Sequence, residues 1–327
     1  MTGRVLVTGA AGFIGGHCCR ALLEEGWRVV GLDNFDPFYP RTVKESGLAE
    51  LRGRPGFTFV EGDIRDAPLV ERLVREADVA LHLAARAGVR PSIEDPELYT
   101  SINVTGTVTL LESCRRAGLR RFVFGSSSSV YGDDTPAPFR EDAPAIAPIS
   151  PYAATKRAGE LYCRVYAHLH GFRIAVLRLF TVYGPRQRPD LAIHKFTRLL
   201  AAGEPIQQFG DGSTEREYTH IDDITTGVLA AVGWVEQEPP AFELLNLGGS
   251  QTIRLDRLIA LIAGALGVTP RIEHLPMSPG DVRRTVADVS RARQLLGYDP
   301  RVTIEDGIRR FVVWYQATTG LGSRAGS

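Results

Sequence analysis

The sequence predicts an α/β fold in which a doubly wound parallel sheet carries a smaller, discontinuous lobe. Three observations support this prediction. Short β-branched runs alternate with amphipathic stretches through the first half of the chain, a glycine-rich turn directly follows the first run, and the alternation stops near residue 180. Because repeated strand-helix-strand units give parallel strands with right-handed crossovers, the first half should form one open sheet covered by helices.

The expected elements follow in order along the chain. Strands are predicted at 4–8, 28–32, 57–60, 79–83, 121–124 and 173–178. Amphipathic segments between them predict helices at 15–25, 67–76, 96–117 and 151–170. Later segments rich in Gly, Pro and polar residues predict loops at 183–189, 209–214 and 237–240. Residues 218–234 are expected to return to the large sheet as a strand end and a helix, and two further helices are expected at 255–266 and 290–296.

This order implies two lobes. Residues 1–180 are expected to form the larger domain, rejoined by about 218–246. The smaller lobe is expected from 181–217 and 247–315, and the small, polar tail 320–327 is expected to be flexible.

The composition excludes several classes of protein. Lys plus Arg equals Asp plus Glu at 38 each, so no net charge attracts nucleic acid or an anionic membrane. No apolar run approaches the length of a membrane span, and the N-terminus lacks the pattern of a signal peptide. The four cysteines, Cys18, Cys19, Cys114 and Cys163, have neither metal-binding nor redox-motif spacing. We therefore expect buried thiols, no metal site and a cytoplasmic protein.

The strand 4–8 runs directly into a GxxGxxG spacing formed by Gly9, Gly12 and Gly15. Gly9 permits a tight turn, Gly12 lets backbone amides approach a pyrophosphate, and Gly15 lets the following helix pack closely. The positive end of that helix then faces the phosphates. This arrangement predicts a Rossmann-type dinucleotide site, in which the other expected loop contacts are Ala11, Phe13 and Ile14.

A carboxylate at the end of the second strand predicts the identity of the dinucleotide. Asp33 lies 18 residues beyond Gly15, where it can accept both ribose hydroxyls of the adenosine. It would repel a 2′-phosphate, and Asn34 follows it instead of an arginine, so NAD is favoured over NADP. The alternative is a solvated acid at a strand end. Weaker expected cofactor contacts follow the third and fourth strands, at Asp63, Ile64, Leu83, Ala84 and Ala85.

A tyrosine and a lysine predict the chemistry. Tyr152 and Lys156 lie four residues apart, on one face of the helix 151–170, and the serine run 126–129 ends the fifth strand. A lysine ammonium and a positive nicotinamide would lower the phenol pKa from about 10 toward neutrality, making Tyr152 a general base. Such a pair alone is more often structural. Its combination with the glycine loop and the serine run favours catalysis.

With these motifs, the chain resembles the extended short-chain dehydrogenase/reductase superfamily, and within it the NAD-dependent sugar-nucleotide epimerases and dehydratases. The resemblance covers nearly all of residues 3–315. It implies that Tyr152 is the catalytic base and Lys156 its orienting cation. It also implies that Ser127 hydrogen-bonds the sugar O4 and that Asn103 positions the cofactor.

The resemblance also bears on the reaction. Family 4,6-dehydratases carry an Asp-Glu pair after the Ser/Thr, whereas this chain has Ser128 and Ser129, so dehydration is disfavoured. Together with Thr181 these serines could hold a carboxylate, although a polar strand end without a ligand is the alternative. The segment 180–196 is similar to the GPxxRPDxAxxKF segment typical of UDP-glucuronate 4-epimerases, in which Arg188 would help to secure the uronate. Further substrate contacts are expected in this segment at Ala192, Lys195 and Phe196.

The nucleotide end of a UDP-sugar is expected in the smaller lobe. Arg216 lies in a segment similar to the family's diphosphate clamp, and Gln208 immediately precedes that segment. Asp281 matches an acid that binds the nucleotide ribose. Ser278 stands where some relatives have a phosphate-binding arginine, so Arg283 is a candidate substitute. Arg216 and Arg188 could instead be surface arginines.

The resemblance therefore implies a UDP-glucuronate 4-epimerase that works through a 4-keto intermediate with transient reduction of bound NAD. The alternatives are a UDP-glucose/galactose 4-epimerase, a UDP-glucuronate decarboxylase, or a catalytically silent NAD-binding regulator. Family decarboxylases usually have Glu at the position of Ser129. The resemblance further implies a homodimer formed through helices 96–117 and 151–170.

Overall fold

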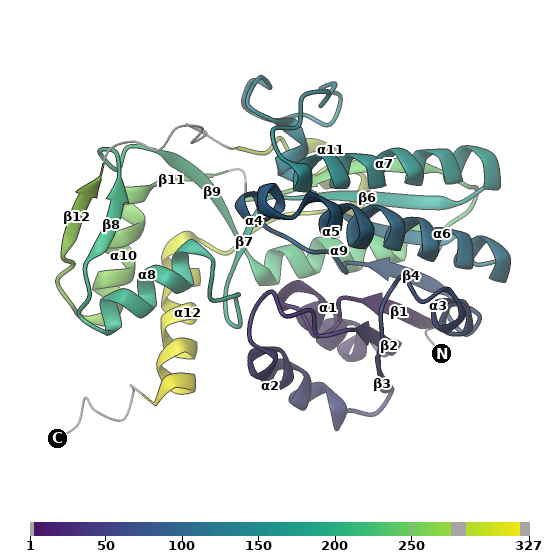
Figure 1. The fold of residues 1–327 in the computed structure, drawn as a ribbon, viewed down its shortest axis with the longest axis horizontal. Helices are drawn as coiled ribbons and strands as arrows, with labels where there is room; N and C mark the ends of the chain where they lie inside the picture. The colour runs from purple at the N-terminus through teal and green to yellow at the C-terminus, as the bar shows by residue number, and fades with distance from the viewer. Residues whose placement is uncertain (1–2, 250, 276–285, 321–327) are drawn as a thin grey trace.

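Seven parallel strands form the large sheet of the computed structural model, which describes residues 3–249, 251–275 and 286–320 (Figure 1). In sheet order they are β10 (Phe242–Leu247), β6 (Arg173–Leu179), β5 (Arg121–Ser127), β4 (Val79–His82), β1 (Arg4–Thr8), β2 (Arg28–Asp33) and β3 (Phe57–Glu61). The order reverses between β1 and β4. The predicted doubly wound Rossmann-type sheet is confirmed, and its reversal point is where such sheets bind ligands, beyond the carboxyl ends of the strands.

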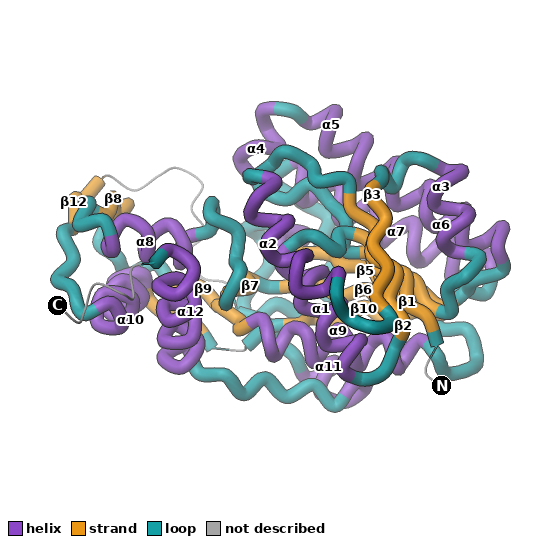
Figure 2. Tube along the Cα trace, turned by 90° about the horizontal axis from the view of Figure 1, so that it is seen from below, coloured by secondary structure: helices purple, strands orange, loops and turns teal. Residues whose placement is uncertain are grey.

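Two helical layers cover the sheet, and alternate residues of each strand serve one layer or the other (Figure 2). Val5 and Val7 face the layer of α1 (Phe13–Glu24), α2 (Arg41–Arg52), α9 (Ile221–Val235) and α11 (Ser290–Leu296). Leu6 faces the layer of α3 (Ala67–Val74), α6 (Gly106–Ala117) and α7 (Pro151–His170). Both faces of every central strand are therefore buried, as the near-continuous apolar runs of the sequence predict.

Each of the six predicted strands begins at the predicted residue, and each ends within three residues of its predicted end. The predicted helix 151–170 is observed as α7, but the predicted helix 96–117 is not regular. It divides into α5 (Pro96–Thr100), a π-helical segment (Ser101–Thr105) and α6. The π-helical segment carries Asn103, whose side chain bonds the backbone of a neighbouring loop, and such interruptions frequently occur at functional sites.

Residues 218–234 differ in part from expectation. The helix, α9, packs against β5 and β6 of the large sheet. The strand before it, β9 (Glu215–His220), instead pairs with β7 (Thr181–Tyr183) and β11 (Thr252–Arg254) in a separate small sheet. The seventh strand of the large sheet is β10, a short apolar run that the sequence analysis had not recognised as a strand.

A second group of elements lies beside the large sheet, on the left in Figure 1. It packs α8 (Ala192–Ala201), α10 (Leu255–Leu266) and α12 (Ile304–Thr319) around its own apolar core. A two-stranded sheet of β8 (Ile206–Phe209) and β12 (Ile272–Leu275) accompanies these helices. Helices α10 and α11 match the predicted segments 255–266 and 290–296, whereas α12 was not predicted. The exact division into lobes stays a prediction.

All four cysteines are free thiols and buried. Every helix within the described ranges is too short or too polar to cross a bilayer. No group of three or more His, Cys, Asp or Glu side chains among the described residues is arranged to hold a metal ion.

Candidate active site

A cavity of about 490 Å³ lies at the carboxyl ends of the large sheet, over its reversal point. Most of the predicted site residues line it, although they come from distant parts of the chain. These residues are Gly9, Gly12, Phe13, Ile14, Gly15, Asp33, Asn34, Asp63, Ile64, Leu83, Ala84, Ala85, Ser127, Ser128, Ser129, Tyr152, Lys156, Thr181 and Arg188.

The glycine loop turns tightly between β1 and α1. Gly9 has φ +75°, and a Cβ there would lie 2.8 Å from the backbone nitrogen of Ala84. A Cβ on Gly15 would lie 2.1 Å from the carbonyl oxygen of Gly9, so the third glycine lets the helix approach the loop itself. Helix α1 begins after Gly12, and no described side chain caps it. Its first amides are therefore available to an anion in the cavity, such as a pyrophosphate.

Asp33 is buried at the end of β2 and holds the glycine loop in place. Its carboxylate accepts hydrogen bonds from the backbone nitrogens of Ala11 (3.1 Å) and Phe35 (2.8 Å). Burial raises the pKa of Asp33, and the buried ammonium of Lys44, 3.9 Å away, opposes that effect together with the two amides. Ala11 thus contacts Asp33 and does not line the cavity, whereas Lys44 lines it and was not predicted.

Asp63 belongs to a second polar group at the rim of the cavity. Its carboxylate accepts hydrogen bonds from Asn34 (2.9 Å) and from the Arg65 guanidinium (2.7 and 2.8 Å). These bonds, above all those from Arg65, lower the pKa of Asp63 to about 2. Asp63 is therefore ionised at neutral pH and links the loops after β2 and β3.

Tyr152, Lys156 and Ser127 meet at the floor of the cavity, where α7 packs on β5. The Lys156 ammonium donates a 2.7 Å hydrogen bond to the carbonyl of Gly125, and burial lowers its pKa to about 8. Burial raises the pKa of the Tyr152 phenol, while a hydrogen bond with Ser127 and the charge of Arg188 oppose the rise. In the protein without NAD, the pKa of Tyr152 is thus shifted upward, opposite to the lowering that the sequence analysis expected from Lys156.

The serine run forms a cluster of hydroxyls beside Tyr152. Ser127 Oγ donates to Ser129 Oγ at 3.1 Å and accepts from the Ser129 backbone nitrogen at 3.2 Å. Ser128 and Thr181 line the same cavity, Thr181 from the start of β7. No carboxylate follows Ser127 in the run, so this wall of the cavity offers neutral donors.

Arg188 lines the same cavity from the loop between β7 and α8. Its guanidinium makes two hydrogen bonds to Asp190 (2.8 and 3.0 Å) and lies 5.0 Å from the ring centroid of Phe38. Two residues earlier, Arg186 pairs with Glu50 on α2. The loop that presents Arg188 is therefore bonded to α2.

A buried ion pair that the sequence analysis missed lies one helical turn beyond Lys156. Glu160, one turn after Lys156, receives two hydrogen bonds from Arg178 on β6 (2.9 and 2.8 Å) and one from Ser126 (2.7 Å). Both charged side chains are only 1% exposed. The spacing of Lys156 and Glu160 on one helical face was the available signal, but the partner on β6 required the three-dimensional order of the strands.

Several predicted residues lie elsewhere. Asn103 is buried behind the cavity, where its amide bonds the backbone of Arg86. Five predicted substrate contacts lie outside the large sheet and do not line the cavity: Ala192, Lys195 and Phe196 on α8, Gln208 on β8 and Arg216 on β9. Asp281, Arg283 and Ser278, like the tail after residue 320, fall outside the described residues.

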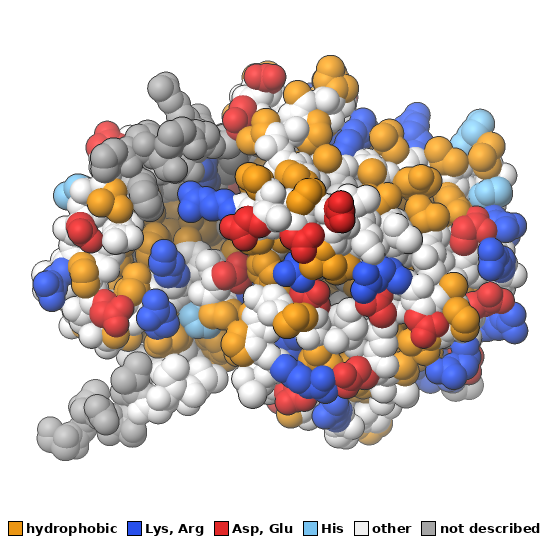
Figure 3. All heavy atoms as spheres, viewed as in Figure 1, with side chains coloured by type: hydrophobic (Ala, Val, Ile, Leu, Met, Phe, Trp, Pro, Cys, Tyr) orange, Lys and Arg blue, Asp and Glu red, His pale blue; other side chains and the backbone are white. Residues whose placement is uncertain are grey.

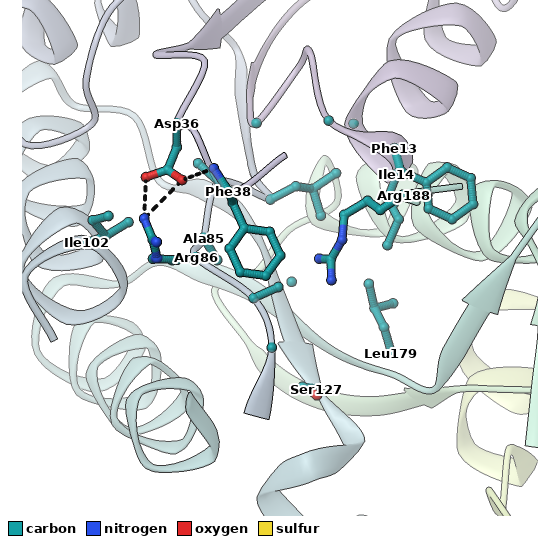
Figure 4. Close-up of a pocket in the computed structure, with 18 of the residues that line it drawn as sticks. Phe13, Ile14, Asp36, Phe38, Ala85, Arg86, Ile102, Ser127, Leu179 and Arg188 are labelled. Carbon is teal, nitrogen blue, oxygen red and sulfur yellow. Dashed lines mark hydrogen bonds and ion pairs between the residues drawn. The ribbon is translucent and has the colours of Figure 1, made fainter. Parts of the chain in front are cut away.

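The cavity also contains residues that sequence reasoning did not single out. The most notable are Asp36 and Phe38 on the loop after β2, and Arg86 on the loop after β4. Figure 4 shows the ion pair of Asp36 with Arg86 and places Phe38 between Arg86 and Arg188. The aromatic pair Phe38 and Tyr39, a few residues after Asp33 and Asn34, was a usable signal for Phe38, whereas nothing local pointed to Arg86.

Comparison with known proteins gives consistent results. The model of the NAD dependent epimerase/dehydratase family matches residues 5–248. UDP-glucuronate 4-epimerase from Thermodesulfobacterium geofontis is 41% identical over 315 residues, covering 95% of this chain and 96% of that protein. The crystal structure of UDP-glucuronic acid 4-epimerase from Bacillus cereus, in complex with UDP-glucuronic acid and NAD, matches with a TM-score of 0.89 at 37% identity, covering 96% of this chain and 99% of that one. UDP-glucose 4-epimerase from Thermotoga maritima, with UDP-glucose, matches with a TM-score of 0.86 at 30% identity, covering 97% and 99%.

Proposed function

This chain belongs to the NAD-dependent epimerase/dehydratase family, and on that premise we propose that it is a UDP-glucuronate 4-epimerase, interconverting UDP-glucuronate and UDP-galacturonate. One observation carries the choice of substrate. A single cavity is lined by Tyr152, by the neutral hydroxyls of the serine run 126–129 and Thr181, and by the Arg188 guanidinium. This combination suits a sugar that bears a carboxylate beside the reacting carbon.

The residues around the cavity fit NAD. The tight approach of Gly9 to Ala84 leaves no room for a side chain, and the uncapped end of α1 offers amides to a pyrophosphate. Asp33 lines the cavity at the end of β2, which supports a role in binding the adenosine ribose. When bound, NAD supplies the hydride acceptor and donor at C4 of the sugar.

Side chains of the protein transfer the proton of the sugar O4. Tyr152 removes the proton from O4 as C4 is oxidised, and the Ser127 hydroxyl holds O4 beside the phenol. Lys156, anchored on Gly125, keeps a positive charge behind the developing phenolate. The resulting 4-keto sugar turns about its diphosphate link and presents its other face, and Tyr152 then returns the proton to O4.

Arg188 and the hydroxyl cluster also restrain the carboxylate of the 4-keto intermediate. A 4-keto uronate is a β-keto acid, which loses CO₂ most easily when its C5–carboxylate bond stands perpendicular to the carbonyl plane. Ser127, Ser128, Ser129 and Thr181, together with Arg188, hold that bond closer to the plane. This restraint separates epimerisation from decarboxylation.

The proposal is tested by offering purified protein and NAD a panel of UDP-glucuronate, UDP-glucose and UDP-N-acetylglucosamine, with NMR of the products. UDP-galacturonate from UDP-glucuronate, at a rate well above that for the neutral sugars, supports the proposal. Faster conversion of UDP-glucose would favour the glucose/galactose epimerase, and a UDP-pentose would favour the decarboxylase. Bound NAD with turnover of none of the three sugars would favour the silent regulator.

We also infer that the protein is a cytoplasmic homodimer. Its four free, buried cysteines suit a reducing compartment. Leu161, Val165 and Leu169 form a stripe along α7 with exposed fractions of 50%, 46% and 64%, and Figure 3 shows apolar side chains gathered over α6 and α7. A contiguous apolar stripe of this kind marks a contact surface.

The dimer is tested by changing the stripe. Val165→Lys is expected to convert dimer into monomer in sedimentation experiments, because it buries a charge in the proposed interface. Val313→Lys on α12 is the matched control, since Val313 is also exposed but lies far from the stripe. A wild-type monomer, or a dimer unaffected by Val165→Lys, would refute the proposed interface.

A further inference from the structure

We propose that Arg86 is a positioning residue that latches the loop after β2 over the cofactor site and, through Phe38, aligns Arg188. The loop, residues 34–39, is called the strap below. The part of this inference that concerns Arg188 rests on the proposed function, whereas the part that concerns the cofactor rests only on NAD binding.

The latch itself is an ion pair between two loops. Arg86 Nη1 donates to both carboxylate oxygens of Asp36, at 3.1 and 3.0 Å, and both residues line the cavity (Figure 4). The two side chains are 20% and 22% exposed. Because they are largely removed from water, their attraction is screened less than that of a surface pair. The pair therefore joins the loop after β4 to the strap across the cavity.

Arg86 is in turn fixed to the catalytic helix. Both of its backbone polar groups are bonded by one side chain, because Asn103 accepts from the Arg86 nitrogen (2.8 Å) and donates to its carbonyl (3.0 Å). The same amide donates to Thr155 Oγ1 on α7 at 3.0 Å, directly before Lys156. Asn103 is 3% exposed, so this anchor is sealed from solvent. The latch thus has a rigid base that shares α7 with Tyr152 and Lys156.

The strap is also held at its start, by the bond of Asn34 to Asp63 and by the buried Phe35 ring, whereas Asp36 holds its centre. The Asp36 carboxylate that binds Arg86 also accepts from the backbone nitrogen of Phe38 (3.0 Å), and the carbonyl of Asp36 accepts from Lys44 (3.0 Å). Asp36 N bonds Asn34 Oδ1 (3.0 Å). Loss of the Arg86 charge would therefore release the carboxylate that also shapes the turn leading to Phe38.

Phe38 carries the effect to the substrate side. Its ring centroid is 5.6 Å from the Arg86 guanidinium carbon and 5.0 Å from that of Arg188, and Figure 4 shows the ring between the two. Guanidinium groups are attracted to aromatic faces at such distances. A Cβ at Gly88 would lie 3.2 Å from Phe38 Cζ, so the loop after β4 also packs on the ring. Displacement of the strap would therefore move the Phe38 ring that contacts the Arg188 guanidinium.

Latching of the strap by Arg86 would be especially useful in an epimerase. The reduced cofactor must stay bound while the 4-keto sugar turns, because its loss would strand the oxidised sugar. A strap latched from the catalytic helix slows that loss, and the same latch keeps Arg188 beside the carboxylate. Gating loops of this kind commonly control release steps.

The test compares Arg86→Met with Arg86→Lys, which retains the charge, and with Asp36→Asn, which removes the partner charge. The first readout is the rate at which fluorescent NADH leaves each protein when displaced by excess NAD. Arg86→Met and Asp36→Asn are expected to release NADH about tenfold faster than wild type, and Arg86→Lys is expected to remain close to wild type. Arg75→Met, which removes an exposed ion pair on α3, is the matched control and is expected to change nothing.

The second readout is the fraction of UDP-glucuronate that ends as stranded 4-keto sugar or UDP-pentose, which should rise in Arg86→Met and not in Arg86→Lys. Equal NADH release from wild type and from both charge-removing variants would overturn the latch, as would release from Arg86→Lys as fast as from Arg86→Met. Faster NADH release from a protein that does not convert UDP-glucuronate at all would leave the latch intact and refute the proposed function instead.

Discussion

The ammonium of Lys156 donates a 2.7 Å hydrogen bond to the carbonyl of Gly125, two residues before Ser127. This bond joins the helix that carries Tyr152 to the strand that carries Ser127. Tyr152 and Ser127, the proposed base and its hydrogen-bond partner, are thus positioned by two regular elements, whereas Arg86 and Arg188 lie on loops. Such placement on rigid elements is what precise proton transfer requires.

Tyr152→Phe is expected to remove the base and leave the fold intact. The ring keeps its edge contact with Tyr99, at 6.4 Å between centroids, so stability should change little. The rate of epimerisation should fall by roughly 10²–10⁴-fold, the usual contribution of a positioned acid-base group. Initial rates by NMR, with circular dichroism as the control for folding, check this prediction. A variant within a few-fold of the wild-type rate would mean that another group takes the O4 proton.

Lys156→Met is expected to abolish turnover and yet stabilise the protein in the absence of cofactor. Burial lowers the pKa of Lys156 from 10.5 to about 8, so the ammonium is held at a cost. That fall in pKa corresponds to a destabilisation of roughly 3 kcal/mol by the buried ammonium. The variant also loses the hydrogen bond to Gly125, which contributes about 1 kcal/mol. The free energy of unfolding of Lys156→Met should therefore exceed that of wild type by about 2 kcal/mol at neutral pH.

The stability difference between Lys156→Met and wild type should depend on pH. Between about 8 and 10.5, the unfolded chain binds the Lys156 proton and the folded chain does not, so wild-type stability rises with pH across that window. The advantage of Lys156→Met should therefore be largest below pH 8 and shrink as the pH approaches 10.5. Urea denaturation of both proteins across this range measures it. A variant that is less stable at every pH would contradict the account.

Breaking the buried pair of Glu160 and Arg178 is expected to be costly. Arg178→Met leaves the 1% exposed Glu160 carboxylate with Arg157 as its remaining cationic partner, and the loss of the fully buried partner should lower the free energy of unfolding by about 3 kcal/mol. Adding Glu160→Gln should recover part of that loss, because the buried charge is removed. Arg75→Met is a suitable control, since an exposed pair contributes less than about 1 kcal/mol. Equal effects of the buried and exposed changes in denaturant melts would show that the pair is not structurally important.

Arg188→Ala is expected to change the products as well as the rate. Without the guanidinium, the C5–carboxylate bond of the 4-keto uronate is less restrained, so CO₂ is lost more often. NMR of the reaction mixture should show a UDP-pentose that the wild-type enzyme does not accumulate. An unchanged epimerisation rate with no pentose would rule out this role for Arg188.

The parts of the site that follow local rules could be predicted from the sequence. Gly9, Gly12 and Gly15 directly follow a strand and have a spacing typical of a strand-turn-helix unit, and Tyr152 and Lys156 face one way because of helical periodicity. Strand starts were predicted to the residue because apolar β-branched runs are short and sharply bounded.

The parts that depend on contacts between distant segments could not be predicted. Asp36 and Arg86 are 50 residues apart, and their pairing follows from β1 lying between β2 and β4. The bond of Glu160 to Arg178 likewise depends on β6 lying beside β5. Helix α12 is different, since the apolar spacing of Ile304, Ile308, Phe311 and Tyr315 was visible and was overlooked.

In the proposed reaction, hydride leaves C4, stays on the enzyme and returns to the same carbon on the other face. The most direct test is to incubate the protein and NAD with UDP-glucuronate that carries deuterium at C4 and to analyse the product by NMR. The account predicts UDP-galacturonate with the deuterium still at C4. Failure to form UDP-galacturonate, or its formation with the C4 deuterium replaced by solvent hydrogen, would contradict it.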